Sequence, residues 1–330
     1  VVDFFELNKQ PIFGPNKFSS QLETSKLFAR YIMEKYNIPQ PAFFECSTEE
    51  EILSIAGQLG LPLVLKADGL AAGKGVIICS TKEELDAGID TMITDKKFGK
   101  ATDKISVEEF LYGEEVSVFA ICDGSEYKII NSAQDHKRAF NDDKGPNTGG
   151  MGAYSPAPIF DNKLKNKVDE KILKPILKAM EIEDSPYKGF LYLGLMIADE
   201  EPYVIEFNVR LGDPETQVLL PLFSSSVFDV MMASINGTIK SVNIKMSNDY
   251  AVTVVLAAEG YPEKYNKGME IKGLNYLNND IVFHAGTKLK NNKIVSSGGR
   301  VLNVVGIDEC LEEAISKAYY LCKQIDFKEK

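Results

Sequence analysis

The stretch Val64–Val76 reads V-L-K-A-D-G-L-A-A-G-K-G-V, and the prediction of the fold starts from it. An apolar run, Leu61–Leu65, leads into this stretch and is followed by Lys66. A second apolar run, Val76–Cys79, closes it. Short apolar runs rich in branched residues and flanked by glycine are typical of strands. The stretch therefore predicts a strand, a glycine-rich loop and a second strand.

The loop has the composition of a phosphate-binding segment. It contains Gly69, Gly73 and Gly75, and it places Lys74 near Lys66. Glycine lets the backbone approach a ligand closely and direct its N–H groups toward an anion. The pattern indicates a polyphosphate ligand. An ordinary flexible hairpin loop is the alternative, because glycine is common in loops.

Two familiar phosphate motifs are excluded at this position. The Walker pattern G-x-x-x-x-G-K-[ST] leads into a helix. Here the spacing is one residue short, Gly75 stands where Ser or Thr is required, and a strand follows. The dinucleotide pattern G-x-G-x-x-G is also absent, because Gly73-Lys74-Gly75 runs directly into Val76-Ile77-Ile78.

Composition limits the class of protein and its partners. The chain has 330 residues, enough for about two domains. Its hydrophobic content of 44% is ordinary, and no apolar run reaches the ~18 residues of a membrane helix. The net charge is −11, and no basic cluster is longer than His136-Lys137-Arg138. We therefore expect no membrane and no nucleic acid partner, and lysines that bind a small anion.

Cysteine and histidine usage points to a reducing compartment. The sequence has two histidines and no C-x-x-C motif, and its five cysteines are widely spaced: Cys46, Cys79, Cys122, Cys310 and Cys322. This pattern argues against a disulfide framework, a zinc site and a His-based triad. We expect a cytoplasmic protein.

Capping and turn signals outline an α+β chain. Ser20-x-x-Glu23 predicts a helix from about residue 20 to Tyr36 with Lys26 in its first two turns, where a plain solvated lysine is the alternative. Residues 1–13 read as the tail of a helix and one strand, and Asn141–Pro158 reads as a long irregular loop. Further helices are expected at 48–60, 81–94, 161–182 (with a kink or break at Pro175), 228–236 and 311–325. Strands are expected at 40–46, 105–111, 115–122, 127–132, 190–197, 203–210, 251–258, 282–285 and 301–305. Antiparallel hairpins outnumber βαβ units in this order, which favours α+β.

The strand Tyr203–Arg210 carries the second group of functional residues. Side chains alternate along a strand, so Ile205, Phe207 and Val209 are expected to form a core face and Glu206, Asn208 and Arg210 the opposite face. A carboxylate and an amide oxygen two residues apart suit Mg²⁺, and the arginine can neutralise a transferred phosphoryl group. A solvated edge strand is the alternative.

A third group is the acidic hairpin near Glu108–Leu111. A strand that ends there can present backbone groups to an adenine edge, and Glu115 can accept ribose hydroxyl groups. A simple acidic hairpin remains the alternative. Cations on phosphates, Mg²⁺ between them and little covalent chemistry from the protein are the requirements of phosphoryl transfer.

The ordered motifs resemble those of the ATP-grasp ligases and, within them, the phosphoribosylamine–glycine ligase family, also called glycinamide ribonucleotide synthetases. The resemblance covers nearly the whole chain and rests on these segments: Gly14-Pro15, Leu22–Lys26, Lys66–Val76, Gln134–Arg138, Asn147–Gly152 and Asn208–Glu215. It implies two α+β lobes that clasp ATP (residues 15–238, with a lid lobe at about 41–107) and a smaller β-rich C-terminal domain (239–330). It also implies that the N-terminal domain is largely absent, with 1–14 as its remnant.

The resemblance implies ligation of glycine to 5-phosphoribosylamine through glycyl phosphate, with ATP as co-substrate and Mg²⁺ or Mn²⁺ as cofactor, in de novo purine biosynthesis by a monomer. Residues implied to bind ATP are Lys26, Lys66, Asp68, Gly69, Gly73, Lys74, Gly75, Glu108, Glu109, Leu111 and Glu115, with Asp68–Gly75 as a lid. Implied metal ligands are Glu206 and Asn208. Implied substrate residues are Asp135, Lys137, Thr148, Gly149, Gly150, Gly152, Arg210 and Asp213, and Lys66, Arg210 and Asp213 are implied to be catalytic.

Three points stay open. Many ATP-grasp enzymes carry a second metal-binding carboxylate on the strand that precedes the Glu206 strand. Here that strand reads Gly194-Leu195-Met196, so the number of metal ligands is open. Gly298-Gly299-Arg300 fits either a ribose-phosphate contact or a plain hairpin turn. A carboxyaminoimidazole synthetase and a non-catalytic nucleotide-binding fragment are the alternative functions.

Overall fold

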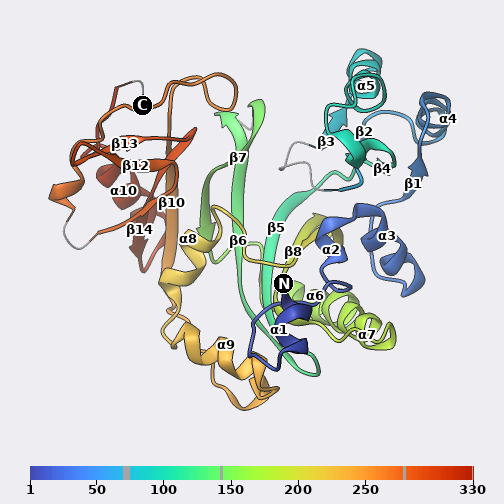
Figure 1. The fold of residues 1–330 in the computed structure, drawn as a ribbon, viewed down its shortest axis with the longest axis horizontal. Coiled ribbons are helices and arrows are strands. Elements are labelled where there is room, and N and C mark those ends of the chain that lie inside the picture. The colour runs from blue at the N-terminus through green and yellow to red at the C-terminus, as the bar shows by residue number, and fades with distance from the viewer. Residues whose placement is uncertain (70–74, 142–143, 278–279, 329) are drawn as a thin grey trace. The chain divides into compact units, whose positions relative to one another are not determined.

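The computed structural model describes residues 1–69, 75–141, 144–277, 280–328 and 330 (Figure 1). It divides into two units. Unit 1 comprises Val1–Ile129, Ile159–Arg210 and Met231–Val242, and unit 2 comprises Ile130–Pro158, Leu211–Val230 and Asn243–Lys330. None of the described helices is long and apolar enough to cross a membrane.

Unit 1 contains a small antiparallel sheet with strand order β1-β4-β2-β3. The strands are β1 (Phe43–Cys46), β2 (Leu63–Ala67), β3 (Val76–Cys79) and β4 (Ile105–Glu109). Its helices are α4 (Glu49–Leu59), α5 (Lys82–Ile89), the π-helical η1 (Asp90–Thr94) and the 3-10 turn η2 (Gly99–Thr102). The predicted strand–loop–strand is confirmed, since β2 pairs with β3 from Leu63↔Cys79 to Lys66↔Val76.

Alternation along β2 and β4 gives this sheet one apolar and one polar face. Leu63 and Leu65 are fully buried and cluster with Ile52 of α4 and with Leu85 and Ile89 of α5. The neighbouring positions on β2 point to the other face, where Lys66 pairs with Ser106 and Val64 with Glu108. A lysine at the end of an apolar run is thus placed beside a carboxylate of the adjacent strand.

The larger sheet of unit 1 has strand order β5-β8-β9, all antiparallel. These strands are β5 (Glu114–Asp123), β8 (Lys188–Ala198) and β9 (Glu201–Asn208). The remaining elements are α1 (Val2–Leu7), α2 (Gln21–Thr24), α3 (Lys26–Lys35), α6 (Asn162–Val168), η3 (Asp169–Leu173), α7 (Lys174–Ile182), α9 (Val227–Ile235), which crosses into unit 2, and η5 (Ile239–Ser241). The predicted strand within residues 1–13 is wrong, because no strand forms there.

The helix predicted from residue 20 to Tyr36 is two helices. Ser25 has an extended backbone between α2 and α3, and its Oγ accepts the Phe28 N–H as the N-cap of α3. Ser20 makes no side-chain cap. Asp68 completes the α3 N-terminus, since its Oδ1 accepts from Ser25 Oγ (2.8 Å) and from the Leu27 N–H (3.1 Å).

The helical run from Asn162 to Ile182 is continuous, although Pro175 predicted a kink or break. Pro175 lies in the first turn of α7, directly after the π-helical segment η3. A π turn changes the i→i+4 hydrogen-bond ladder just where a proline supplies no N–H. The segment before the proline therefore absorbs the disruption without ending the helix.

Strand β9 contains a bulge that the alternation rule did not predict. Gly194 pairs with Glu206, but the next residue of β8, Leu195, pairs with Val204, so Ile205 is the extra residue. Val204 and Phe207 are fully buried, whereas Ile205 is partly exposed. The predicted core position of Ile205 is wrong, and the strand ends at Asn208 before it reaches Val209 or Arg210.

Unit 2 is built on an antiparallel run of strands in the order β11-β14-β10-β7-β6. The elements are β6 (Tyr127–Phe140, which begins in unit 1), β7 (Lys144–Ser155), β10 (Tyr250–Ala257), β11 (Ile281–His284), the hairpin β12 (Thr287–Lys290) and β13 (Lys293–Ser296), β14 (Arg300–Asp308), α8 (Thr216–Leu219), η4 (Leu220–Leu222), η6 (Leu274–Tyr276) and α10 (Leu311–Cys322). Helix α10 packs on one face of β10 and β14 (Figure 1), where Ala314 and Ala318 contact Val252.

The long irregular loop predicted at Asn141–Pro158 is wrong, because most of it is strand β7. β7 pairs with β10 from Gly152↔Val254 to Ser155↔Ala251, and with β6 on its other side. Its glycines hid the strand pattern. At Gly152 the close approach explains the glycine, since a Cβ there would lie 2.7 Å from the carbonyl oxygen of Thr253.

Candidate active site

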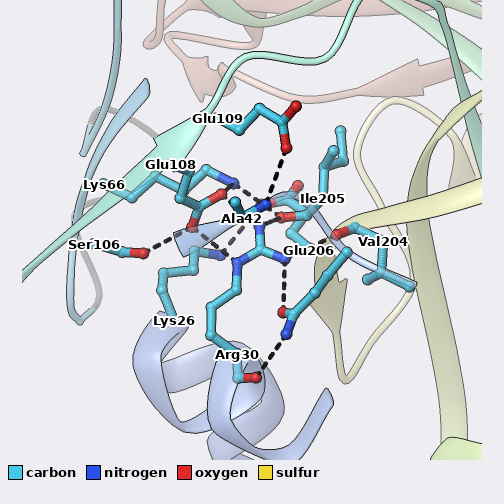
Figure 2. Close-up of polar contacts among 11 residues, drawn as sticks. Lys26, Arg30, Ala42, Lys66, Ser106, Glu108, Glu109, Val204, Ile205 and Glu206 are labelled. Carbon is cyan, nitrogen blue, oxygen red and sulfur yellow. Dashed lines mark hydrogen bonds and ion pairs between the residues drawn. The ribbon is translucent and has the colours of Figure 1, made fainter. Parts of the chain in front are cut away.

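A buried carboxylate organises the polar face of the small sheet in unit 1. Figure 2 shows Lys26 and Arg30 extending from one helix, α3, toward Glu108 and Lys66. The Arg30 guanidinium donates from Nε to Glu108 Oε1 (2.9 Å) and from Nη2 to Oε2 (2.5 Å). Ser106 Oγ donates to Oε1 (2.9 Å), and Lys66 Nζ lies 2.8 Å from Oε2. Glu108 therefore holds two cations at once.

The same two cations also bind the bulge of β9. Arg30 donates from Nη1 to the Val204 carbonyl (2.8 Å) and from Nη2 to the Ile205 carbonyl (2.9 Å). Lys66 Nζ donates to the Ile205 carbonyl as well (2.9 Å). The bulge thus turns backbone acceptors toward charges that would be costly to bury without partners.

Charge and burial shift the pKa values in this cluster. Burial opposes ionisation of Glu108, but the charges of Lys66 and Arg30 outweigh it and hold its pKa at about 2. Burial lowers the pKa of Lys66 to about 8. The negative charge of Glu108 opposes this shift, and the positive charge of Arg30 adds to it. The trio of one carboxylate and two cations keeps a net positive charge at neutral pH, which suits an anionic ligand.

We expect Glu108 to make the free energy of unfolding fall at acidic pH. Its pKa is lower in the folded chain (about 2) than its ordinary value of 4.5. Its contribution is therefore complete above pH 4.5 and is lost as the pH falls through 2. The shift corresponds to about 3 kcal/mol of unfolding free energy. Urea unfolding at several pH values between 5 and 2 measures it, with Glu108→Gln as the reference. An equal acid dependence in both proteins would contradict the assignment.

A second ion pair lies one helical turn before Arg30. Lys26 Nζ lies 3.2 Å from Glu206 Oε2, and both side chains are partly exposed. Glu206 pairs with Gly194 of the neighbouring strand β8. A Cβ added to Gly194 would lie 3.0 Å from Glu206 Cγ. A side chain at position 194 would therefore require Glu206 to shift by a few tenths of an ångström.

Glu206 and Asn208 fit a hydrated magnesium ion. They lie two residues apart in regular register beyond the bulge, so they share one face of β9. Mg²⁺ prefers oxygen ligands and keeps several waters when it binds one or two protein groups. In the described part of the chain, no group of three or more His, Cys, Asp or Glu residues is arranged to hold a metal. The donor set thus suits two protein ligands and does not suit a metal cage.

Three further residues predicted to contact the nucleotide, Asp68, Gly69 and Gly75, lie at the two ends of the glycine-rich stretch. Asp68 caps α3, as described above, and Gly69 has a φ of +145° that favours glycine. The carbonyl of Gly75 accepts from the Ala67 N–H (2.8 Å). Gly73 and Lys74 lie outside the described residues.

The segment after β4 carries further residues that were predicted to bind the nucleotide. Glu109 is exposed at the strand end, and its Oε2 accepts from the Ala42 N–H (3.2 Å). Leu111 follows, outside any strand, and within the described residues its N–H and C=O have no protein partner. Glu115 lies on β5, paired with Met196.

Arg210 forms an ion pair with Glu23. Its Nη2 lies 3.0 Å from Glu23 Oε1, and 59% of its side chain is exposed. The other oxygen of Glu23 accepts from the Val209 N–H (2.8 Å). Glu23 therefore fixes the chain where β9 ends and leaves much of the guanidinium accessible.

The residues predicted for the acceptor side lie in unit 2, apart from Arg210. Lys137 Nζ lies 3.9 Å from Asp135 Oδ1, and the carbonyl of Lys137 accepts from Thr148 Oγ1 (2.8 Å). Thr148 Oγ1 also accepts from the Gly150 N–H (3.0 Å). Gly149, Gly150 and Asp213 share a contact with Arg300. These contacts join β6, β7 and Arg300 within unit 2.

Arg30 is the functional residue that sequence reasoning missed. It is 2% exposed, and it connects α3, β4 and β9. Its spacing was informative: it lies four residues after Lys26, on the same side of the helix. An arginine at a buried helix position needs an anionic partner, and the sequence could not identify Glu108 as that partner.

Comparison with known proteins adds a family match. A family model described as "Phosphoribosylglycinamide synthetase, ATP-grasp (A) domain" matches residues 24–216, and its C domain counterpart matches residues 251–330. Two relatives named phosphoribosylamine–glycine ligase, from Caldanaerobacter subterraneus and Ralstonia nicotianae, are each 43% identical over 99% of this chain. The chain covers 79% and 78% of their lengths.

Solved structures agree with this match. The crystal structure of phosphoribosylamine–glycine ligase from Thermotoga maritima is 39% identical, with a TM-score of 0.87 over 96% of this chain and 80% of that one. A biotin carboxylase from Campylobacter jejuni is 16% identical, with a TM-score of 0.74 over 99% of this chain and 72% of that one. The second similarity concerns the fold alone.

Proposed function

Because the chain belongs to the phosphoribosylglycinamide synthetase family, we propose that it ligates glycine to 5-phosphoribosylamine at the expense of ATP. It is a ligase of purine biosynthesis with an ATP-grasp fold, and its family uses ATP and a divalent metal. The observation that carries the residue assignments is the charge cluster of unit 1, in which two lysines lie beside carboxylates on strands β4 and β9.

The proposed reaction has two steps. A glycine carboxylate oxygen attacks the γ-phosphorus of ATP, so that glycyl phosphate forms and ADP leaves. The amine nitrogen of phosphoribosylamine then attacks the glycyl carbonyl carbon, so that the amide forms, phosphate leaves and the nitrogen loses a proton. The protein contributes positioning and charge to the first step and binds no intermediate covalently.

Each residue of the cluster has a proposed part. Lys66 and Lys26 bind phosphate oxygens, and Glu108 with Arg30 holds Lys66 in place. Glu206 and Asn208 hold the metal, which we propose to be Mg²⁺ or Mn²⁺ and which neutralises phosphate charge when bound. The backbone of Leu111 and the carboxylates of Glu109 and Glu115 bind the adenosine. Glu108 was also predicted to contact the nucleotide, but it is 1% exposed and both of its oxygens bind protein groups, so we assign it to Lys66 instead. Arg210 stabilises charge on the transferred group.

Further assignments follow from the family. We propose that Asp135, Lys137, Thr148–Gly152 and Asp213 contact the acceptor, and that Asp68, Gly69, Gly73, Lys74 and Gly75 contribute to ATP binding. The proposed domain limits are 15–238 and 239–330, with a lid lobe at about 41–107. A monomer in the cytoplasm is the proposed working form.

Replacing Glu206 with alanine is expected to reduce glycine-dependent ADP release by about 10²-fold or more, because a metal-bound carboxylate is lost. The assay couples ADP release to glycine and phosphoribosylamine over a series of Mg²⁺ concentrations. Glu201→Ala on the same strand is the matched control, since Glu201 pairs with surface lysines. Equal activity of the Glu206 variant and this control would exclude the metal assignment.

The same assay separates the alternatives. If bicarbonate and an aminoimidazole ribonucleotide, but not glycine and phosphoribosylamine, drive ADP release, the chain is a carboxyaminoimidazole synthetase. If ATP binds and no acid promotes ADP release, the chain is a non-catalytic nucleotide-binding protein. Either result would overturn the proposed function.

A further inference from the structure

Arg300, the first residue of β14, connects three segments of unit 2. Its Nη1 donates to the carbonyl of Gly149 and to the carbonyl of Asp213 (3.1 Å), and it lies 3.4 Å from the carbonyl of Gly150. Its Nη2 donates to Asp213 Oδ2 (2.8 Å). One guanidinium therefore joins β7 and the Asp213 turn to the start of β14.

Two glycines of β7 lie beside this contact. A Cβ on Gly149 would lie 3.0 Å from the central guanidinium carbon of Arg300. Gly150 has a φ of +101°, and a Cβ there would lie 2.4 Å from Pro214 Cδ. At Gly150 the backbone conformation and the approach to Pro214 both exclude a larger residue, whereas at Gly149 a side chain would require Arg300 to shift by a few tenths of an ångström.

Tyr261 adds a further contact to the same segment. Its hydroxyl oxygen accepts from the Gly149 N–H (3.0 Å). The N–H and the C=O of Gly149 are therefore both bound to side chains of the C-terminal part of unit 2. The two peptide groups that flank the Gly149 Cα are therefore each held, one by a phenol and the other by a guanidinium.

Asp213 is oriented by two donors. Its Oδ2 accepts from Arg300, and its Oδ1 accepts from Gln217 Nε2 (2.8 Å). About half of the Asp213 side chain stays exposed, whereas the Arg300 side chain is 20% exposed. The planar arginine fork suits such a task, because it binds several acceptors in fixed directions. The accessible carboxylate is thus the presented group, and the arginine is its support.

We propose that Arg300 is a positioning residue for the second step of the reaction, the attack by the acceptor amine. It acts through Asp213 and Gly149–Gly150 and does not itself contact the substrate. This inference rests on the proposed function, in which these residues contact the acceptor. It assigns Arg300 a role in acceptor binding and none in the formation of glycyl phosphate.

The test separates the two steps. Hydroxylamine traps acyl phosphates as hydroxamates, so ATP, glycine and hydroxylamine report the first step without phosphoribosylamine. Arg300→Ala and Arg300→Lys are expected to keep wild-type hydroxamate formation. Both are expected to raise the KM for phosphoribosylamine about tenfold or more, because a small misplacement of a binding group is costly. Lysine is not expected to rescue, since one ammonium cannot reach all of these acceptors.

Two controls make the result decisive. Lys317→Ala removes a cation that also donates to a β14 carbonyl, that of Ile307 (3.2 Å), and it should leave both steps unchanged. The double variant Arg300→Ala with Asp213→Ala should lose clearly less than the product of the two single losses, because one of the two routes from Arg300 runs through Asp213. Multiplying effects would show that Arg300 acts independently of Asp213 and would overturn the inference.

The outcomes distinguish this inference from the proposed function. If the wild-type protein forms no hydroxamate from glycine, the proposed function fails. If it does, and Arg300→Lys has an unchanged melting temperature and a wild-type KM for phosphoribosylamine, the role of Arg300 is refuted. A loss of hydroxamate formation equal to the loss of overall turnover in a folded variant would refute it as well.

Discussion

Lys66→Ala is expected to lower glycine-dependent ADP release by about 10²- to 10³-fold, the range for removal of one preorganised charge-stabilising donor. The reason is the position of the ammonium group, which Glu108 and the Ile205 carbonyl hold at 2.8 Å and 2.9 Å. A cation that is already held in place needs no reorganisation when a phosphate group binds. Initial rates at saturating glycine and phosphoribosylamine, over a range of ATP concentrations, measure the loss.

The fold should survive this substitution. Without Lys66, the bidentate pair of Arg30 and Glu108 remains, and its net charge is zero. Lys104→Ala is the matched control, since Lys104 is an exposed lysine of the same lobe paired with Glu45. A Lys66 variant with the turnover of this control, or with the melting behaviour of an unfolded chain, would contradict the assignment.

Glu108→Leu is expected to lower the free energy of unfolding by about 3–5 kcal/mol, the range for breaking a buried ion pair. The substitution leaves two cations, Lys66 and Arg30, buried at 7% and 2% exposure without their carboxylate. The pKa of Lys66 should then fall below its value of about 8, because its strongest attraction is removed. Urea unfolding at pH 7 measures the first effect, and the pH profile of nucleotide binding measures the second.

The neighbouring residue supplies the control. Glu109 is exposed on the same strand, and its carboxylate accepts one hydrogen bond, from Ala42. Glu109→Leu should change stability by less than about 1 kcal/mol, as surface substitutions usually do. Similar losses in the two variants would show that Glu108 is no more than an ordinary charge on β4.

Local sequence rules predicted much of unit 1 because the relevant signals span few residues. The helix expected at 48–60 forms as α4, which begins at a capping box of Thr48 and Glu51, and the run before Lys66 becomes β2. The rules failed where a residue's partner lies far along the chain. Ser20 was predicted to cap the helix, but Ser25 is the N-cap of α3. Asp68, which lies 43 residues further along the chain, binds Ser25 there. Strand β7 was missed, because its glycines serve close contacts that no local pattern records.

The sequence by itself determined the family and the residue types that binding of phosphate and metal requires. Those properties depend on the order of residues, and Lys66, Glu206 and Asn208 could be read from it. Tertiary structure alone decided which partner holds each charge. Arg30 meets Glu108 across 78 residues, and Lys66 meets Ile205 across 139, at a bulge that breaks the alternation rule. A buried charge is stable only beside its partners, and the folded chain places those partners together.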